Sequence, residues 1–217
     1  MGEVIMSGIV PKLKAPPTLS SFAVGSVVKL SEGGVLKDFY VAQHNYESAL
    51  NGTGRTLLVR KENYGTQWRW NTTSVNAYAT SAIDSWLNTS YPDVLGDAER
   101  AAAGTTVFYY TPGNGNNVVD TLERSFFLLS LTELGFSASY ANEEGTAIPV
   151  AGLLTTTTYG QWTRSPYTNN KVNAHKVTAA QSASNDSVTT SLWFRPCFTF
   201  PATAQFDVET LAFKGVF

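Results

Sequence analysis

The sequence predicts an α+β domain in which two helices pack on a twisted, mostly antiparallel set of strands joined by long loops. Short runs rich in β-branched and aromatic residues recur along the chain, with Gly and Asn between them. The segment 74–88 instead has apolar residues at helical spacing. At 217 residues, the chain is long enough for one domain whose core needs neither a disulfide nor a metal.

The first strands are expected over residues 26–30, 38–44 and 56–61, which read "SVVKL", "DFYVAQH" and "TLLVRK". The separators "EGG" and "NGTG" are typical of turns. Three prolines and little periodicity mark the stretch before the first strand. We therefore expect residues 1–24 to form an extended N-terminal arm and residues 25–217 to form the domain. The alternative is that the proline-rich stretch is an edge segment of the domain.

The clearest predicted helix covers residues 74–88, with Ser74 as its N-cap and Pro92 as a stop beyond its end. A second, shorter helix is expected over 95–104, closed by a glycine. Further strands are expected over 105–110 and 124–130, flanking the loop "TPGNGNNVVD". A single helical turn should follow in "LTELGF", and the last third should be mostly strand and loop.

The charge balance excludes several classes of partner. Fifteen Lys and Arg against seventeen Asp and Glu give a net charge of −2, with no basic block. Such a chain has no electrostatic footprint for nucleic acid or an anionic membrane. It has no apolar run of membrane-spanning length, and its first residues, "MGEVIMSGIVPKLKAPP", lack the apolar core of a Sec signal peptide. We expect no membrane insertion and no export by its own signal.

Few residues could support catalysis or metal binding. The two histidines, His44 and His175, fit no metal-ligand spacing, and no nucleotide-binding or nucleophile motif occurs. His44 is interpreted as structural, and His175 as a surface contact or a residue without a role. The single Cys197 excludes an internal disulfide and predicts a small buried side chain. The sequence predicts a protein that is not an enzyme and that has no cofactor and no metal.

Two Trp/Arg clusters, "QWTRSP" and "LWFRPC", are more informative. They place Arg164 and Arg195 among apolar and aromatic residues, where a guanidinium needs a carboxylate or an aromatic face. Trp162 and Trp193 offer such faces, and Glu133 is a candidate carboxylate. We interpret these residues as a structural frame, the alternative being direct ligand contact.

The frame leaves the polar stretch between the clusters, residues 166–191, free to vary. It is rich in Asn, Ser, Thr and Tyr, the residues typical of binding loops. We expect a long loop here that presents side chains to a ligand.

The order of four motifs carries a family resemblance. "SAIDSWLN", "FLLSLTELG", "QWTRSP" and "FRPCF" follow one another between about residues 20 and 201. In this order the sequence resembles an uncharacterised domain family of Gram-positive gut bacteria and their phages. That family is similar to the formylglycine-generating-enzyme group and to the variable proteins of diversity-generating retroelements. The resemblance implies a C-type-lectin-like fold.

The resemblance also implies a function: a non-enzymatic receptor-binding module on a phage tail or other virion part. It would bind a cell-surface protein or glycan, and its Asn-rich segment would suit a diversity-generating retroelement target. Tyr109, Tyr110 and the loop 111–117 would assist. The expected ligand-binding residues are Tyr167, Asn169, Asn170, Asn173, His175, Asn185 and Asp186.

The alternative is a structural virion subunit of a tail, baseplate or head, docked onto its assembly partners through residues 7–24. Analogy with phage fibres adds a homotrimer, and a chain outside a virion would be cytoplasmic. Two departures from the family pattern limit the comparison. Thr163 stands where Leu is usual, and the lone Cys197 lacks the partner that the oxidase branch requires. Calcium-dependent lectin motifs are also missing.

Overall fold

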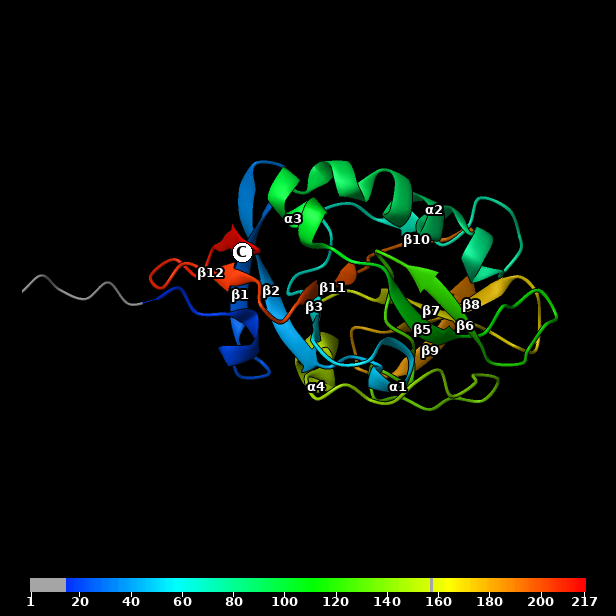
Figure 1. The fold of residues 1–217 in the computed structure, drawn as a ribbon. Coiled ribbons are helices and arrows are strands. Elements are labelled where there is room, and N and C mark those ends of the chain that lie inside the picture. Colours follow the sequence, from blue (N-terminus) through cyan, green and yellow to red (C-terminus); the bar gives the residue numbers. More distant parts are fainter. Residues whose placement is uncertain (1–14, 157) are drawn as a thin grey trace, which may run out of the picture.

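The computed structural model describes residues 15–156 and 158–217, and the elements are arranged as in Figure 1. Helices and strands are mixed and the strand pairs are antiparallel, which confirms the predicted α+β class. The strands are β1 (Val27–Glu32), β2 (Val35–His44), β3 (Arg55–Arg60), β4 (Trp68–Arg69), β5 (Thr106–Tyr110), β6 (Asp120–Arg124), β7 (Gln161–Pro166), β8 (Asn173–Val177), β9 (Ala183–Ser187), β10 (Ser191–Leu192), β11 (Cys197–Pro201), β12 (Gln205–Phe206) and β13 (Phe213–Gly215). The helices are α1 (Ser48–Asn51), α2 (Ala82–Thr89), α3 (Asp97–Ala102) and α4 (Ala151–Thr155), with 3₁₀ turns η1 (Leu19–Ser21), η2 (Tyr78–Thr80) and η3 (Tyr91–Val94).

The largest sheet has the strand order β1-β2-β3-β11 and joins the two ends of the chain. Its first three strands confirm the three strands predicted before residue 62. The centre of β3, residues 57–59, is apolar, which fits a strand inside the sheet whose residues 56–60 are all buried. β11 pairs with it from Cys197 opposite Val59 to Pro201 opposite Arg55. Cys197 is fully buried, as predicted.

A second group of strands lies at the other end of the molecule, on the right of Figure 1. It contains the hairpin β5-β6 and the three-stranded antiparallel sheet β7-β8-β9. β7 is buried at every position from Gln161 to Pro166, so it belongs to the core of this end of the molecule.

The helix predicted over residues 74–88 begins later than expected. Residues 74–77 are irregular, η2 follows, and α2 starts after Ser81, whose hydroxyl accepts a hydrogen bond from Asp84 N at 3.1 Å. Ser74 is therefore not the N-cap. The apolar spacing correctly predicted which side chains face the core. The side chain of Asn76, however, holds distant loops. The second predicted helix is present as α3.

The strand predicted over residues 124–130 is also wrong. β6 ends at Arg124, and the buried stretch 126–130 makes a single bridge, between Phe127 and Cys197. Side chains take the place of a partner strand: the Tyr78 hydroxyl accepts from Leu128 N at 3.0 Å, and Glu133 accepts from Ser130 N at 2.8 Å. Apolar composition predicted burial here but not the kind of hydrogen-bond partner.

The N-terminal segment differs from the expected extended arm. Residues 1–14 lie outside the described part of the chain, but residues 18–22 pack on the domain. Leu19 is fully buried and its N–H donates to Ala204 O at 2.7 Å, while the ring of Phe22 meets that of Phe206 edge-on at 5.5 Å. The edge-segment alternative describes these residues better. Within the described ranges, no helix is long and apolar enough to span a membrane.

Arg164 in β7 is the buried ion that fixes this end of the fold. Its Nη1 donates to Glu133 Oε2 at 2.6 Å and to Leu128 O at 2.9 Å, and its Nε donates to Tyr109 O at 2.9 Å. Both charged side chains are fully buried. The guanidinium lies 4.7 Å from the ring centre of Phe108. The predicted Glu133 partner is confirmed, while the aromatic face belongs to Phe108 rather than to a tryptophan.

Replacing Arg164 should therefore be costly. Arg164→Met leaves Glu133 buried without its counter-ion, and we expect the free energy of unfolding in urea to fall by about 3–5 kcal/mol. Arg100→Met is the matched control, because Arg100 pairs with Asp93 and Asp97 at the surface. It should cost less than about 1 kcal/mol. Equal losses in the two variants would show that the buried pair does not stabilise the fold.

Candidate functional site

The stretch 166–191 is not the open loop that its composition predicted. It contains β8 and β9, which pair with each other from Asn173 opposite Ser187 to Val177 opposite Ala183, while β8 also pairs with β7. "NAHKV" carries no alternation that would have predicted β8, because Ala174 and Val177 are three positions apart and neighbouring Ala174 and His175 are both buried. Asn and Ser dominate the composition, which predicted a loop instead. The tight turn 167–172 and the β8–β9 connection are the only loops longer than three residues within this described stretch.

The predicted ligand-binding residues divide into exposed and structural ones. Asn169 is exposed, and most of the others are half-buried. His175 is a correction, because it is only 1% exposed and its ring nitrogens face carbonyl oxygens, Tyr140 O at 3.1 Å and Ser184 O at 3.3 Å. It lies on the inner face of β8 and cannot make the surface contact that was expected of it.

The half-buried asparagines make hydrogen bonds within the domain. Asn170 Oδ1 accepts from Val172 N and from Asn173 N, both at 2.9 Å. Asn173 Nδ2 donates to Asn185 Oδ1 at 2.8 Å across the β8–β9 pair. Asp186 forms an ion pair of 2.8 Å with Lys176. Tyr167 packs its ring against that of His175, with centroids 5.4 Å apart. These side chains shape the surface more than they display themselves on it.

Three loops lie together beside this sheet, and we call their surface the three-loop face. It comprises residues 111–119, 137–142 and 167–172. Each pair of loops is joined directly: Asn117 Nδ2 donates to Thr168 O at 2.9 Å, Asn142 Nδ2 donates to Asn117 O, and Thr168 N donates to Tyr140 O at 2.8 Å. The three loops therefore form one connected unit. Of the assisting tyrosines predicted in β5, Tyr110 is buried.

Asn76, which is 1% exposed, anchors this unit from behind. Its Nδ2 lies within 3.0 Å of three carbonyl oxygens, those of Tyr167, Asn170 and Asn173, and its Oδ1 accepts from Asn114 N at 2.8 Å. The contact is close enough that a Cβ on Gly113 would lie 2.0 Å from Asn76 O. Sequence reasoning placed Asn76 on a helix and missed this role, because the partners are 38 to 97 positions away.

Tyr140 is the second residue that sequence reasoning missed. Its φ is +62°, a conformation that bulky residues rarely adopt. The Tyr140 carbonyl stabilises it by accepting from Thr168 N and from Thr168 Oγ1 at 2.9 Å. The ring packs against Tyr167 at 5.2 Å yet remains 51% exposed. Such a conformation, held by surrounding bonds, is typical of functional surfaces.

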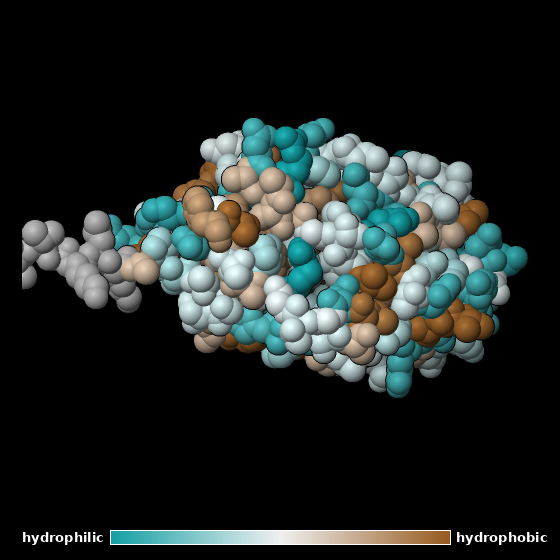
Figure 2. Space-filling model, in the orientation of Figure 1, coloured by the Kyte–Doolittle hydropathy of each residue, from teal (hydrophilic) through white to brown (hydrophobic). Residues whose placement is uncertain are grey.

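The exposed part of the three-loop face is mixed in character. Val118 is 73% exposed and Val172 is 41% exposed, and Asn169 and Lys171 are also at the surface. Figure 2 shows hydrophobic and hydrophilic groups interspersed at the end of the molecule that carries β5, β6 and β8. Aromatic and apolar contact area beside amides is the composition of many binding surfaces.

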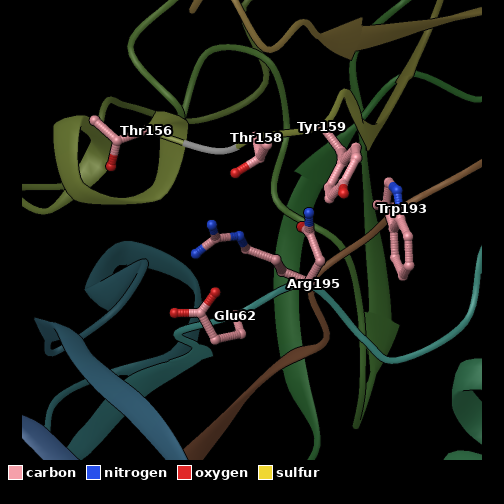
Figure 3. Close-up of a pocket in the computed structure, with 7 residues that line it drawn as sticks. Glu62, Thr156, Thr158, Tyr159, Trp193 and Arg195 are labelled. Atoms are coloured by element: carbon pink, nitrogen blue, oxygen red, sulfur yellow. The ribbon is translucent and has the colours of Figure 1, made fainter.

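A pocket of about 200 Å³ opens near the other end of β7 (Figure 3). Arg195, Trp193 and Glu62 contribute to its walls together with Tyr159. Arg195 is buried and donates from Nη1 to Lys61 O. The residues that line the pocket are Glu62, Asn63, Thr156, Thr158, Tyr159, Trp193 and Arg195.

Within residues 15–156 and 158–217, no group of three His, Cys, Asp or Glu side chains could hold a metal ion. Burial raises the pKa of the Cys197 thiol well above its ordinary value, so the thiol stays protonated and shielded from solvent.

Removing the anchor should loosen the three-loop face. For Asn76→Ala we expect a loss of about 2–3 kcal/mol in the free energy of unfolding, because several buried backbone groups lose their partner. Asn169→Ala, the exposed counterpart in the same face, should change it by no more than about 0.5 kcal/mol. Urea unfolding of both variants measures the difference. Similar values for the two would contradict the role given to Asn76.

His175 predicts a pH dependence. Its carbonyl partners favour the imidazolium, but burial prevails and lowers its pKa below 6.5. The folded state therefore holds the neutral ring, and its stabilisation is present above pH 6.5 and lost as the pH falls through the folded-state pKa. The melting temperature of the wild type should drop more than that of His175→Gln in this range. Asp84, whose pKa burial raises to about 6, titrates in both proteins and cancels from the comparison. If the melting temperatures of the wild type and of His175→Gln fell in parallel with pH, His175 would not be the source of the pH dependence.

Comparison with known proteins gives a family. Residues 53–202 match the family described as "Domain of unknown function (DUF6273)". No curated protein and no solved structure matches the chain. The matched region contains α2, Arg164, Arg195 and the whole three-loop face. Because the match extends over more than half of the sequence, the chain belongs to the DUF6273 family.

Proposed function

We propose that this protein is a non-enzymatic binding module that recognises its partner through the three-loop face. One observation carries the proposal: three loops distant in sequence are hydrogen-bonded to one another and together expose Tyr140, Val118 and Val172. Exposed apolar side chains gathered on a shaped surface are a common mark of an interaction site.

The hydrogen bonds between the loops matter for affinity. A loop that must become ordered on binding loses conformational entropy, and this loss subtracts from the binding free energy. Here Asn76 and the Tyr140 carbonyl hold the loops before any partner arrives. An aromatic side chain such as that of Tyr140 then adds a large contact area with few rotatable bonds.

The partner that fits this face is a cell-surface protein or glycan. Asn, Thr and Lys side chains offer hydrogen bonds, while the tyrosine ring and two valines offer apolar contact. We further propose a C-type-lectin-like module on a phage tail or other virion part. The antiparallel strands, few helices and long loops support that assignment, together with the motif resemblance.

The same proposal narrows the positions that a diversity-generating retroelement could vary. Asn169, Lys171 and Val172 are exposed in the turn after β7, so other side chains fit there without disturbing the backbone. Asn170 and Asn173 hold the turn through their side chains and are unsuitable. Natural variants of this protein should differ from one another at Asn169, Lys171 and Val172.

Binding of the purified, fluorescently labelled protein to intact Gram-positive gut bacteria tests the function. Val118→Asp and Tyr140→Asn should each reduce cell binding by about tenfold or more, because a charge or a lost ring removes apolar contact. Asn suits the left-handed backbone at position 140, so the fold should be kept. Val35→Asp is the matched control, since Val35 is 56% exposed on the distant β1-β2 hairpin.

Unchanged binding by the two face variants would contradict this proposal. Loss of binding in Val35→Asp alone would move the interaction to the other end of the molecule. Treating the cells with protease or with periodate before binding distinguishes a protein receptor from a glycan.

A further inference from the structure

Arg195 is an exception among the buried arginines. Arg60 and Arg164 each face a buried carboxylate, Glu32 at 3.0 Å and Glu133 at 2.6 Å. Arg195 is only 7% exposed, yet it forms no ion pair within the described residues. Nη1 donates to the Lys61 carbonyl, while Nε is buried and has no hydrogen-bond partner there. A buried cation without a counter-charge is costly unless a ligand supplies one.

Burial has a measurable consequence for this side chain. It lowers the pKa of Arg195 to about 10, and the negative charge of Glu62 opposes the shift only in part. The guanidinium is still a cation at neutral pH. Because Nη1 is taken by a carbonyl and Nε is buried, Nη2 is the part of the guanidinium left for a ligand, and its N–H groups suit a carboxylate oxygen.

The same pocket also provides acceptors. Glu62 is exposed, forms no ion pair within the described residues, and reaches into the pocket beside Arg195 (Figure 3). Asn63 also lines the pocket, but its Oδ1 is buried without a hydrogen-bond partner in the described chain and is not open to a ligand. One wall thus presents the Arg195 cation with the unbonded donors of Nη2, and a neighbouring wall presents the Glu62 carboxylate. A ligand that satisfies both carries an anionic group and a hydrogen-bond donor a short distance apart.

An aromatic wall completes the pocket. The rings of Tyr159 and Trp193 lie 5.4 Å apart and are inclined by 35°. Trp193 is fixed through its backbone, because its carbonyl accepts from Trp162 N at 2.8 Å. Gln67, with its amide turned to satisfy both of its polar atoms, accepts from the indole Nε1 at 3.1 Å. These contacts hold an apolar surface beside the charged groups.

We infer that this pocket binds a free α-amino acid with an apolar side chain. The carboxylate would lie against Nη2 of Arg195, the ammonium against Glu62, and the side chain against Tyr159 and Trp193. The volume of about 200 Å³ is below the range of about 300–1,000 Å³ for drug-sized ligands, so a single amino acid suits it better than a longer chain.

Charge argues against the nearest rivals. Inorganic phosphate would bring two charges to a pocket with one cation and would repel Glu62. An uncharged sugar would stack on the rings but leave the Arg195 cation without a counter-charge. A zwitterion cancels both charges. The site is independent of the three-loop face, because it lies at the Gln161 end of β7 while that face follows Pro166.

Isothermal titration of the full chain with the neutral L-α-amino acids tests the inference. We expect at least one, with leucine and phenylalanine as the first probes, to bind with a dissociation constant below about 1 mM. Its amide, which lacks the carboxylate, and its N-acetyl derivative, which lacks the ammonium, should each bind at least about tenfold more weakly.

Variants assign the binding to the pocket. Glu62→Gln should weaken binding about tenfold or more, whereas Glu123→Gln, an exposed carboxylate on β6, should leave it unchanged. Glu62 is at the surface, so this variant should fold even where Arg195→Lys does not. Absence of binding by every amino acid at about 1 mM would overturn the inference. Binding that ignores Glu62→Gln, or that the N-acetyl derivative matches, would equally overturn it.

Discussion

The buried ion pair between Arg164 and Glu133 is the constraint on which the functional end of this protein depends. A guanidinium can leave water only if its charge and its donors are satisfied, and here the carboxylate, the Leu128 carbonyl and the Tyr109 carbonyl do so. These partners belong to β5, to the irregular stretch 126–130 and to the turn that follows it. One side chain therefore positions three segments that have no complete strand pairing among themselves.

The ion pair is part of a larger buried network. The Tyr46 hydroxyl donates to Glu133, and the Ser165 hydroxyl donates to Glu144. Burial raises the pKa of Glu144, while the positive charge of Arg164 opposes that rise. Glu144 also accepts a hydrogen bond of 2.7 Å from the backbone N–H of Thr111, and Thr111 is the first residue of the three-loop face. The network thus reaches from the core of β7 to the base of the proposed binding surface. Arg195 differs from Arg164. It is also buried, but it forms no ion pair within the described residues, and the ligand of the proposed pocket supplies its counter-charge.

Much of this fold could be predicted from local sequence, because local patterns decide its regular parts. Runs of branched apolar residues predicted β1 to β3. The cost of burying a charge predicted that Arg164 pairs with Glu133. The errors arise where a residue acts over a long distance. Asn76 lies before the helix that was predicted to include it, because its partners are in other loops, and Tyr140 adopts its backbone conformation through Thr168 and His175. The strands in 166–191 were missed because neither "NAHKV" nor "ASNDS" alternates between apolar and polar residues. Of the asparagines predicted to contact a ligand, Asn170, Asn173 and Asn185 instead make hydrogen bonds within the domain.

Amide hydrogen exchange measures the central claim, that the buried network holds the three-loop face rigid before a partner binds. The amides of Thr168 and Asn114, which donate to Tyr140 O and to Asn76 Oδ1, are the reporters. In the wild type they should exchange as slowly as the amides inside β7, and Glu133→Gln should accelerate their exchange together with that of β7. Exchange of Thr168 and Asn114 in the wild type at the rate of an unstructured peptide would contradict the account.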